Sequence, residues 1–192
     1  GFIQISFVVI TIIANTRGLN DAAAVGIVEK IIGILFLVPS SMLSSVSALA
    51  AQNIGANRQD RARQTLMYAI CIVVGFGMVI AGILQFYSAQ AVGIFEDDAA
   101  VMRLGGQYLK SYVLDCMFAG VHFCFSGYFC AVGKSGISFI HNVLSILLVR
   151  IPGSYLASVN FPNTLYPMGL AAPMGSLLSI IICVIAYIWL LK

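Results

Sequence analysis

The chain has 192 residues, of which 60% are hydrophobic and only 9% are charged, and its net charge is +3. Because a soluble domain carries about 25% charged residues, this composition excludes an ordinary soluble protein and a disordered chain. The few basic residues are too dispersed to form a phosphate-binding face, which excludes a nucleic acid as a partner. The composition therefore predicts a protein whose solvent is membrane lipid.

Long stretches of the chain contain no Asp, Glu, Lys or Arg, namely 31–57, 64–95, 116–133 and 151–191. About 20 apolar residues suffice to cross the hydrocarbon core of a bilayer as a helix. The pattern therefore predicts an all-α, polytopic membrane protein. We expect six transmembrane helices, in the ranges 2–15, 22–51, 64–89, 104–131, 137–158 and 168–191.

The first predicted helix begins inside an apolar segment, with no Met and no basic stretch before it. We therefore expect residues 1–192 to be a single unit of a longer protein, with this helix truncated. Gln4, Thr11 and Asn15 follow one another at spacings of seven and four residues, which places them on one face of a helix. Polar groups in a membrane helix turn away from lipid. This face is predicted to form interhelical hydrogen bonds or to line a substrate cavity.

The second predicted helix is long, and Pro39 is expected to kink it. Ser40, Ser44 and Ser47 share a face, and small residues at this spacing allow two helices to approach closely. Glu29, near the outer end, is expected to reach the headgroup region.

The fourth predicted helix carries Asp115 near its middle, where a charged group is costly and needs a reason. Tyr108, Asp115 and His122 are spaced seven apart on one helical face, and Tyr112 and Ser126 lie on the same stripe. Such a face can bind and release a proton or coordinate a cation. Asp115, Tyr112 and His122 are therefore the candidate coupling residues. The alternative is a protonated acid that is merely hydrogen-bonded to a tyrosine.

The fifth predicted helix contains Asn142 and Arg150, with Pro152 directly after. Arg150 is expected either to pair with a carboxylate or to extend toward the interface. Pro152 lacks an N–H and so frees a backbone carbonyl one turn earlier, which Arg150 or Ser154 could help to satisfy.

The charges between the helices indicate the orientation, because cytoplasmic loops are enriched in Lys and Arg. One side of the predicted bundle carries Arg58, Arg61, Arg63, Lys134 and Lys192 against Asp60. The other side carries Arg17 and Arg103 against Asp21, Glu96, Asp97 and Asp98. Both ends of the segment are therefore expected to be cytoplasmic.

Several phrases of the sequence match a known family in order and spacing. Residues 51–56 read AQNIGA, close to a "GQxxGA" phrase before a basic loop, with Ala51 in place of its first glycine. Tyr108-Leu109-Lys110 followed by 127–134 resembles a "YLR…G…GxGD" stretch, in which Lys134 replaces the final Asp. Arg150-Ile151-Pro152 is similar to an "RxP" motif. The chain thus resembles the multidrug and toxic compound extrusion (MATE) family, over the C-terminal six-helix lobe of a twelve-helix transporter.

The resemblance implies two six-helix lobes around a cleft and alternating access between the two sides of the membrane. The expected activity is export of cationic or amphipathic drugs and toxins in exchange for H⁺ or Na⁺, with no resident cofactor. The expected partners are membrane lipid, an N-terminal six-helix lobe and a small organic cation, in the plasma membrane of a bacterium. The residues expected to line the substrate cleft are Gln4, Thr11, Asn15, Tyr108 and Asn142.

The same resemblance places Asp115 at the acidic position of the lobe's fourth helix. The NorM-like branch has a second acid in the first helix of this lobe, where this chain has Gln4. A two-carboxylate Na⁺ site built on these two positions is therefore not expected.

Three alternatives stay open beside the exporter. A lipid-intermediate or polysaccharide flippase would need several intramembrane cations, but only Lys110 and Arg150 are available. A non-transporting membrane subunit would not need the buried ionisable residues. An enzyme is not expected, since there is no HExxH motif and only His122 and Ser126 could form a base–nucleophile pair.

Overall fold

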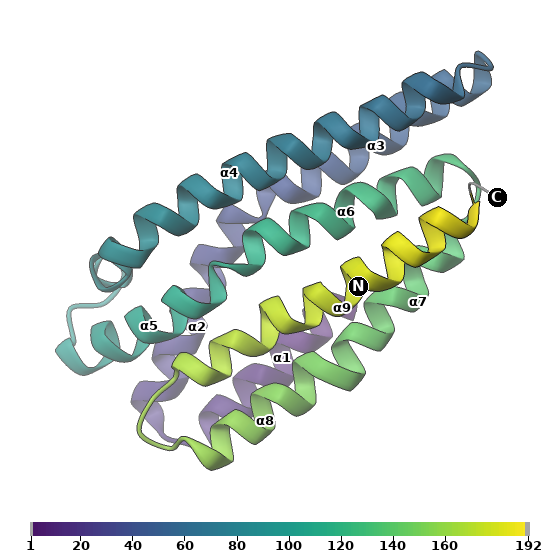
Figure 1. Ribbon diagram of the computed structural model, residues 1–192. Coiled ribbons are helices and arrows are strands. Elements are labelled where there is room, and N and C mark those ends of the chain that lie inside the picture. Colours follow the sequence, from purple (N-terminus) through teal and green to yellow (C-terminus); the bar gives the residue numbers. More distant parts are fainter. Residues whose placement is uncertain (1, 191–192) are drawn as a thin grey trace.

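The computed structural model describes residues 2–190, with side chains from Ile5 onward, and is shown in Figure 1. Helices cover nearly all of this described range, and their ends are joined by short turns. In chain order they are α1 (Phe2–Asn15), α2 (Leu19–Leu35), α3 (Leu37–Gly55), α4 (Gln59–Gly93), α5 (Ala99–Tyr112), α6 (Asp115–Ala131), α7 (Ser135–Ser145), the π-helical turn η1 (Ile146–Arg150), α8 (Ile151–Asn160) and α9 (Tyr166–Leu190).

These helices fall within or close to the six predicted ranges and confirm an all-α membrane protein. Among the described residues, four helical runs are long and apolar enough to cross a membrane: Leu19–Gly55, Gln59–Gly93, Ser135–Asn160 and Tyr166–Leu190. The bent pair of α5 and α6 makes a fifth. The described part of α1 is apolar but shorter, so six is an approximate number of spans.

Residues 52–63 lie between the second and third predicted helices, but in the structure only 56–58 lie outside helices. α3 ends where Asn57 adopts a left-handed φ of 57°, and the Arg58 N–H bonds to the Asn53 carbonyl. This is a Schellman-type helix end, which bonds carbonyls of the last turn that would otherwise lack partners. α4 then starts at Gln59, because its glutamine, arginine and alanine residues are strong helix formers.

The second predicted helix is divided into α2 and α3 at Phe36, with Pro39 in the first turn of α3. Proline cannot donate a backbone hydrogen bond to the residue four positions earlier, and its ring crowds that residue's carbonyl. Pro39 therefore explains why the helix is interrupted at Phe36, about one turn earlier.

The fourth predicted helix is not continuous, contrary to the sequence prediction. α5 and α6 are bent by 40° relative to each other, with Val113 and Leu114 between them. Asp115 therefore lies in the first turn of α6 and not in the middle of a straight helix.

The fifth predicted helix runs from α7 to α8 through the π-helical turn η1. The Ile151 N–H bonds to the Ile146 carbonyl, five residues back. Pro152 follows directly and has no N–H for the carbonyl of Leu148, so the wider turn lies where the α-helical ladder is interrupted. Arg150 is the last residue of this turn.

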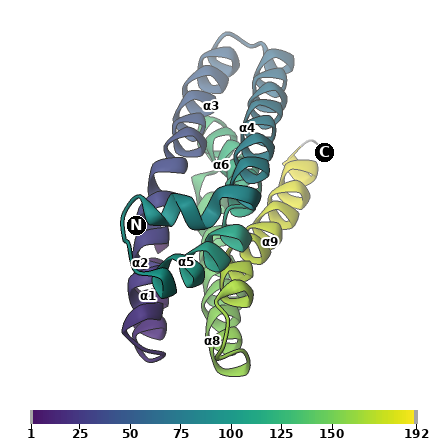
Figure 2. The same cartoon turned by 90° about the vertical axis from the view of Figure 1, so that its left-hand side faces the viewer.

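α6 lies at the centre of the bundle, in contact with α3, α4, α7 and α9 (Figure 1). Figure 2 shows α3 and α4 side by side, forming an arm that rises above the rest of the bundle. α3 and α6 approach each other closely at Gly127, where a Cβ atom would collide with the Leu43 carbonyl oxygen and lie 3.2 Å from the Ser47 nitrogen. The prediction that the serine face of α3 packs closely is wrong, because Ser40 and Ser44 are exposed and the buried residues of α3 are Pro39, Val46 and Ala50.

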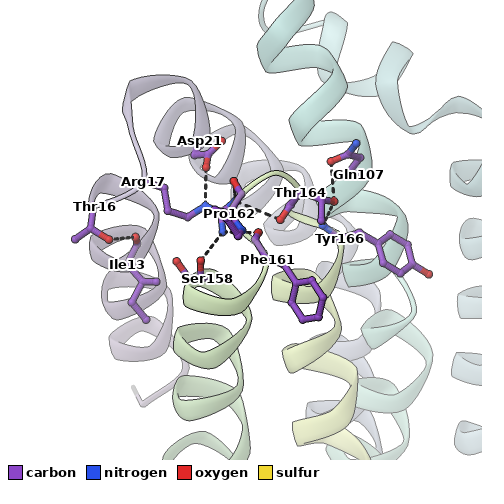
Figure 3. A network of polar contacts seen from close by, with 10 residues as sticks. All are labelled: Ile13, Thr16, Arg17, Asp21, Gln107, Ser158, Phe161, Pro162, Thr164 and Tyr166. Carbon is purple, nitrogen blue, oxygen red and sulfur yellow. Dashed lines mark hydrogen bonds and ion pairs between the residues drawn. The ribbon is translucent and has the colours of Figure 1, made fainter.

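Arg17 ties the α1–α2 turn to the loop between α8 and α9 (Figure 3). Its Nε donates to Asp21 Oδ2 at 2.6 Å, and its side chain is only 7% exposed. Its two terminal nitrogens donate to the carbonyls of Ser158, Phe161, Pro162 and Thr164 at 2.9–3.2 Å. The planar guanidinium thereby satisfies carbonyls at and beyond the end of α8, where a positive charge also suits the helix dipole.

Replacing Arg17 by lysine is expected to lower the free energy of unfolding by about 1.5–3 kcal/mol, the range for hydrogen bonds to charged groups. A single ammonium group cannot reach Asp21 and four carbonyls in the geometry of the guanidinium fork. Chemical denaturation in detergent measures the loss. Arg103→Lys is the control, because Arg103 is exposed on α5. Equal stability of Arg17→Lys and Arg103→Lys would contradict a stabilising role for the hydrogen bonds of Arg17.

Candidate ion-coupling site

A buried ion pair joins η1 to α6 in the interior of the bundle. Arg150 Nη2 donates to Asp115 Oδ2 at 2.9 Å and to the Tyr112 hydroxyl at 2.7 Å. The Asp115 side chain is fully buried and that of Arg150 is 7% exposed. Of the two arrangements that the sequence left open for Arg150, the structure thus contains the pairing with a carboxylate.

Three local irregularities bring these groups together. The bend before α6 places Asp115 at the positive end of that helix's dipole. The end of α5 places Tyr112 beside it, and the π-helical turn directs Arg150 toward both. The guanidinium also lies over the rings of Phe7 and Tyr112, at 5.8 and 5.5 Å from their centroids, which favours a cation there.

The ion pair leaves one polar atom on each of its two side chains without a hydrogen bond. Asp115 Oδ1 and Arg150 Nε are buried and make no hydrogen bond of good geometry among the described residues, although the Ser176 hydroxyl lies near enough to the Asp115 carboxylate to interact with it. An unpaired charged oxygen in a dry interior is costly. A proton or a small cation bound at Asp115 Oδ1 would remove this cost.

A second carboxylate, that of Glu29, lines a cavity together with Phe7, the ring over which the Arg150 guanidinium lies. Glu29 Oε2 is 3.0 Å from the Thr11 hydroxyl, which is also 2.9 Å from the Phe7 carbonyl. Glu29 is half-buried, and its charge interacts with that of Arg150. The cavity that it lines with Phe7 and Thr11 has a volume of about 280 Å³ and lies on the α1–α2 surface.

The structure bonds Glu29 to Thr11 of α1, and its depth relative to the lipid headgroups stays a prediction. Glu29 lies within α2, four residues after Val25 and three before Ile32, and both of these side chains are fully buried. This spacing is the signal that could have placed Glu29 on the packed face of the helix. Because α2 starts at Leu19 and packs on α1, Glu29 bonds to Thr11 at the edge of this contact.

Two histidines extend the polar groups along α6. His122 lies two turns beyond Asp115, about 10 Å along the helix axis, and its Nε2 is 3.5 Å from the Ser176 hydroxyl. His141 of α7 is fully buried, with its ring nitrogens 2.9 Å from the Ser126 hydroxyl and 3.2 Å from that of Ser179. The centroids of the two imidazole rings are 5.4 Å apart.

His141 was not identified from the sequence. The sequence pattern that could have identified His141 is its spacing from Ser138, three residues before it, and Ser145, four residues after it. This spacing places the three polar residues on one face of α7. His122 was selected for its spacing from Asp115, and the structure places the Nδ1 of His122 in the interior without a partner among the described residues.

The remaining predicted residues are distributed over the bundle. Tyr108 is 1% exposed and its ring packs edge-on against Tyr112. Asn142 is half-buried and donates to a carbonyl of its own helix, that of Ser138, while Asn15 is exposed. The side chain of Gln4 lies outside the described residues. The structure thus brings Asp115, Tyr112, Arg150 and Thr11 into one region, and the substrate-cleft assignments stay predictions.

Comparison with known proteins supplies the family. The family model named MatE matches residues 2–156, which is most of the chain. The chain belongs to the MatE family. It is similar to the FAD transporter of Shewanella oneidensis, with 26% identity over 170 residues that cover 85% of this chain and 36% of the relative. It is also similar to the "Probable multidrug resistance protein NorM" of Bacillus cereus, with 21% identity over 78% of this chain and 33% of the relative.

The fold of the MatE chain is that of solved MATE transporters. A mutant of the Vibrio cholerae MATE transporter VcmN superposes with a TM-score of 0.90 at 17% identity, over 98% of this chain and 42% of that one. The chain spans about a third of the length of the curated relatives named above, at 36% and 33%. Members of the MatE family are multi-pass membrane transporters and not enzymes, in agreement with the sequence prediction.

Proposed function

We propose that this chain is the C-terminal six-helix lobe of a secondary active transporter that exports cationic or amphipathic compounds in exchange for H⁺ or Na⁺. The single observation that carries the proposal is the buried Asp115–Arg150 pair, in which one carboxylate oxygen makes no hydrogen bond of good geometry among the described residues. Intramembrane ionisable groups mark ion pathways by default because of their cost. The second lobe completes the cleft, and the rocking of the lobes gives alternating access.

Arg150 acts as the movable cation of this site in the proposed mechanism. It pairs with Asp115 and interacts with the charge of Glu29 on α2. A proton or Na⁺ that binds Asp115 competes with the guanidinium, which then shifts toward Glu29. The half-buried Glu29, in its surface cavity, is the point of entry. The ion drives transport only as far as its affinity differs between the two states of the transporter.

The substrate class needs a direct comparison, since one relative is named as a FAD transporter and another as a multidrug resistance protein. Asp115 and Glu29 each keep a buried carboxylate oxygen without a hydrogen bond of good geometry to the described residues, which favours a cationic compound. An anionic dinucleotide is the second candidate, and a flippase substrate is the third.

The experiment uses everted vesicles that contain the complete two-lobe protein. Efflux of a fluorescent organic cation is measured under a Na⁺ gradient and then under a pH gradient, with FAD as the alternative substrate. We expect efflux under one gradient, and at least a tenfold loss in Asp115→Asn at equal membrane content. No efflux under either gradient would contradict the exporter and favour the flippase.

A second variant separates coupling from stability. Asp115→Asn leaves the Arg150 guanidinium without its carboxylate, so the variant could fail through misfolding alone. Asp115→Asn with Arg150→Gln removes both charges together. Efflux that returns in this double variant would show that Asp115 only balances a charge, and would overturn its coupling role. Efflux that stays lost in a stable double variant supports the proposal.

A further inference from the structure

One end of the bundle contains a pocket that the proposed transport mechanism does not use. Its volume is about 340 Å³, and it lies where α3 and α9 end and α4 and α7 begin, beside the last turn of α6. Figure 1 shows these ends on the same side of the bundle. The residues that line the pocket are Ile54, Gln59, Arg63, Tyr128, Ala131, Val132, Lys134, Tyr187 and Leu190.

Among the described residues, those that line this pocket carry only positive charges. Arg63 and Lys134 line it from two different helix ends, and the described lining residues include no carboxylate. Within residues 2–190, neither cation takes part in an ion pair. Both α4 and α7 begin at this pocket, and no side chain caps the N-terminus of either helix. Free backbone N–H groups and the positive ends of two helix dipoles add to the attraction for an anion.

The aromatic residues place the pocket at the depth of the lipid headgroups. Tyr187 and Tyr128 pack edge-on, at 5.5 Å between centroids, on one wall. Trp189, in the last turn of α9, is 68% exposed. Exposed tryptophan at the end of an apolar helix is typical of the membrane–water interface. The apolar wall residues Ile54 and Leu190 provide a surface for the first carbons of an acyl chain.

We propose that this pocket binds the phosphate headgroup of an anionic phospholipid. Basic pockets between transmembrane helices bind such headgroups. The phosphodiester lies between Arg63 and Lys134, the Tyr128 and Tyr187 rings flank the glycerol, and the acyl chains extend along the apolar surface of the bundle. A free phosphate ion shares the charge but would leave the apolar wall unused. The end that carries this pocket is also the one with the excess of basic residues, predicted to face the cytoplasm.

The test uses the complete transporter, delipidated in detergent, and measures binding of phosphatidylglycerol and phosphatidylcholine by native mass spectrometry. We expect the wild type to retain phosphatidylglycerol in preference to phosphatidylcholine. Arg63→Gln with Lys134→Gln is expected to weaken phosphatidylglycerol binding roughly tenfold or more, since each cation near an anionic surface contributes separately. Inorganic phosphate, added at the same concentration, is the third probe.

The control is Arg58→Gln with Arg61→Gln. Both residues are exposed at the same end of the bundle, carry the same charge and do not line the pocket. Equal weakening in this control would overturn the site, because bulk charge would then suffice. Equal binding of the two lipids by the wild type would also overturn it. Displacement of phosphatidylglycerol by an equal concentration of inorganic phosphate would replace the lipid by a free anion and overturn the assignment.

Discussion

Arg150→Met is expected to lower the free energy of unfolding by about 3–5 kcal/mol, because it leaves the Asp115 carboxylate buried without a counter-charge. The carboxylate is fully buried, its Oδ2 loses the hydrogen bond at 2.9 Å, and its Oδ1 already makes no hydrogen bond of good geometry among the described residues. Tyr112 also loses the donor to its hydroxyl. The change is measured as a shift in the denaturation midpoint of the complete protein in detergent.

The double variant Arg150→Met with Asp115→Leu completes the cycle. Replacing a buried ion pair by apolar residues of similar volume is often neutral or stabilising, because both desolvation costs disappear. We expect the double variant to recover most of the lost stability but none of the ion-driven efflux. A double variant as unstable as the sum of its two single changes would show that the charges do not compensate each other in the folded protein.

Gly127→Ala is expected to destabilise the bundle by about 3 kcal/mol or more, at the upper end of overpacking effects. The new methyl group would collide with the Leu43 carbonyl oxygen and crowd the Ser47 nitrogen, and both belong to the backbone of α3. A side chain could rotate away, but a helix backbone can only move as a unit. α3 and α6 would therefore separate along their contact, which thermal unfolding in detergent and reduced membrane content both report.

Gly82→Ala is the matched control, since it is the same substitution within α4. A Cβ atom at Gly82 meets nothing within 4 Å. Alanine is the better helix former by up to about 1 kcal/mol, so this variant should be neutral or more stable. If Gly127→Ala were as stable as Gly82→Ala, the close approach of α3 to α6 would be refuted.

The helical membrane architecture could be predicted from the sequence because it depends on local quantities. The charge-free stretches 31–57, 64–95 and 151–191 are long enough to span a bilayer, and lipid leaves helices as the structure that satisfies their backbone. The break before Pro39 has a purely local cause as well. Asp115 and Arg150 could be recognised individually, since charge in an apolar helix is conspicuous wherever it lies.

The partners of those charges depend on the tertiary structure. The sequence left Arg150 free to pair or to reach the interface, and its bond to Asp115 needs the bend between α5 and α6 together with the π-helical turn η1. The bond between Glu29 and Thr11 was not predicted, because it depends on α1 packing against α2. His141 was overlooked because its partners, Ser126 and Ser179, are distant in the chain.

Composition and periodicity thus determined that this chain is an all-α membrane unit, and its motifs indicated the family that the comparisons confirmed. The hydrophobicity of a segment is the sum of the contributions of neighbouring residues, so membrane-spanning segments can be predicted from the sequence alone. Only the tertiary structure decided which carboxylate faces which cation, and where a basic pocket forms between helix ends. Both depend on the positions of helices relative to one another, which arise from packing between residues far apart in sequence.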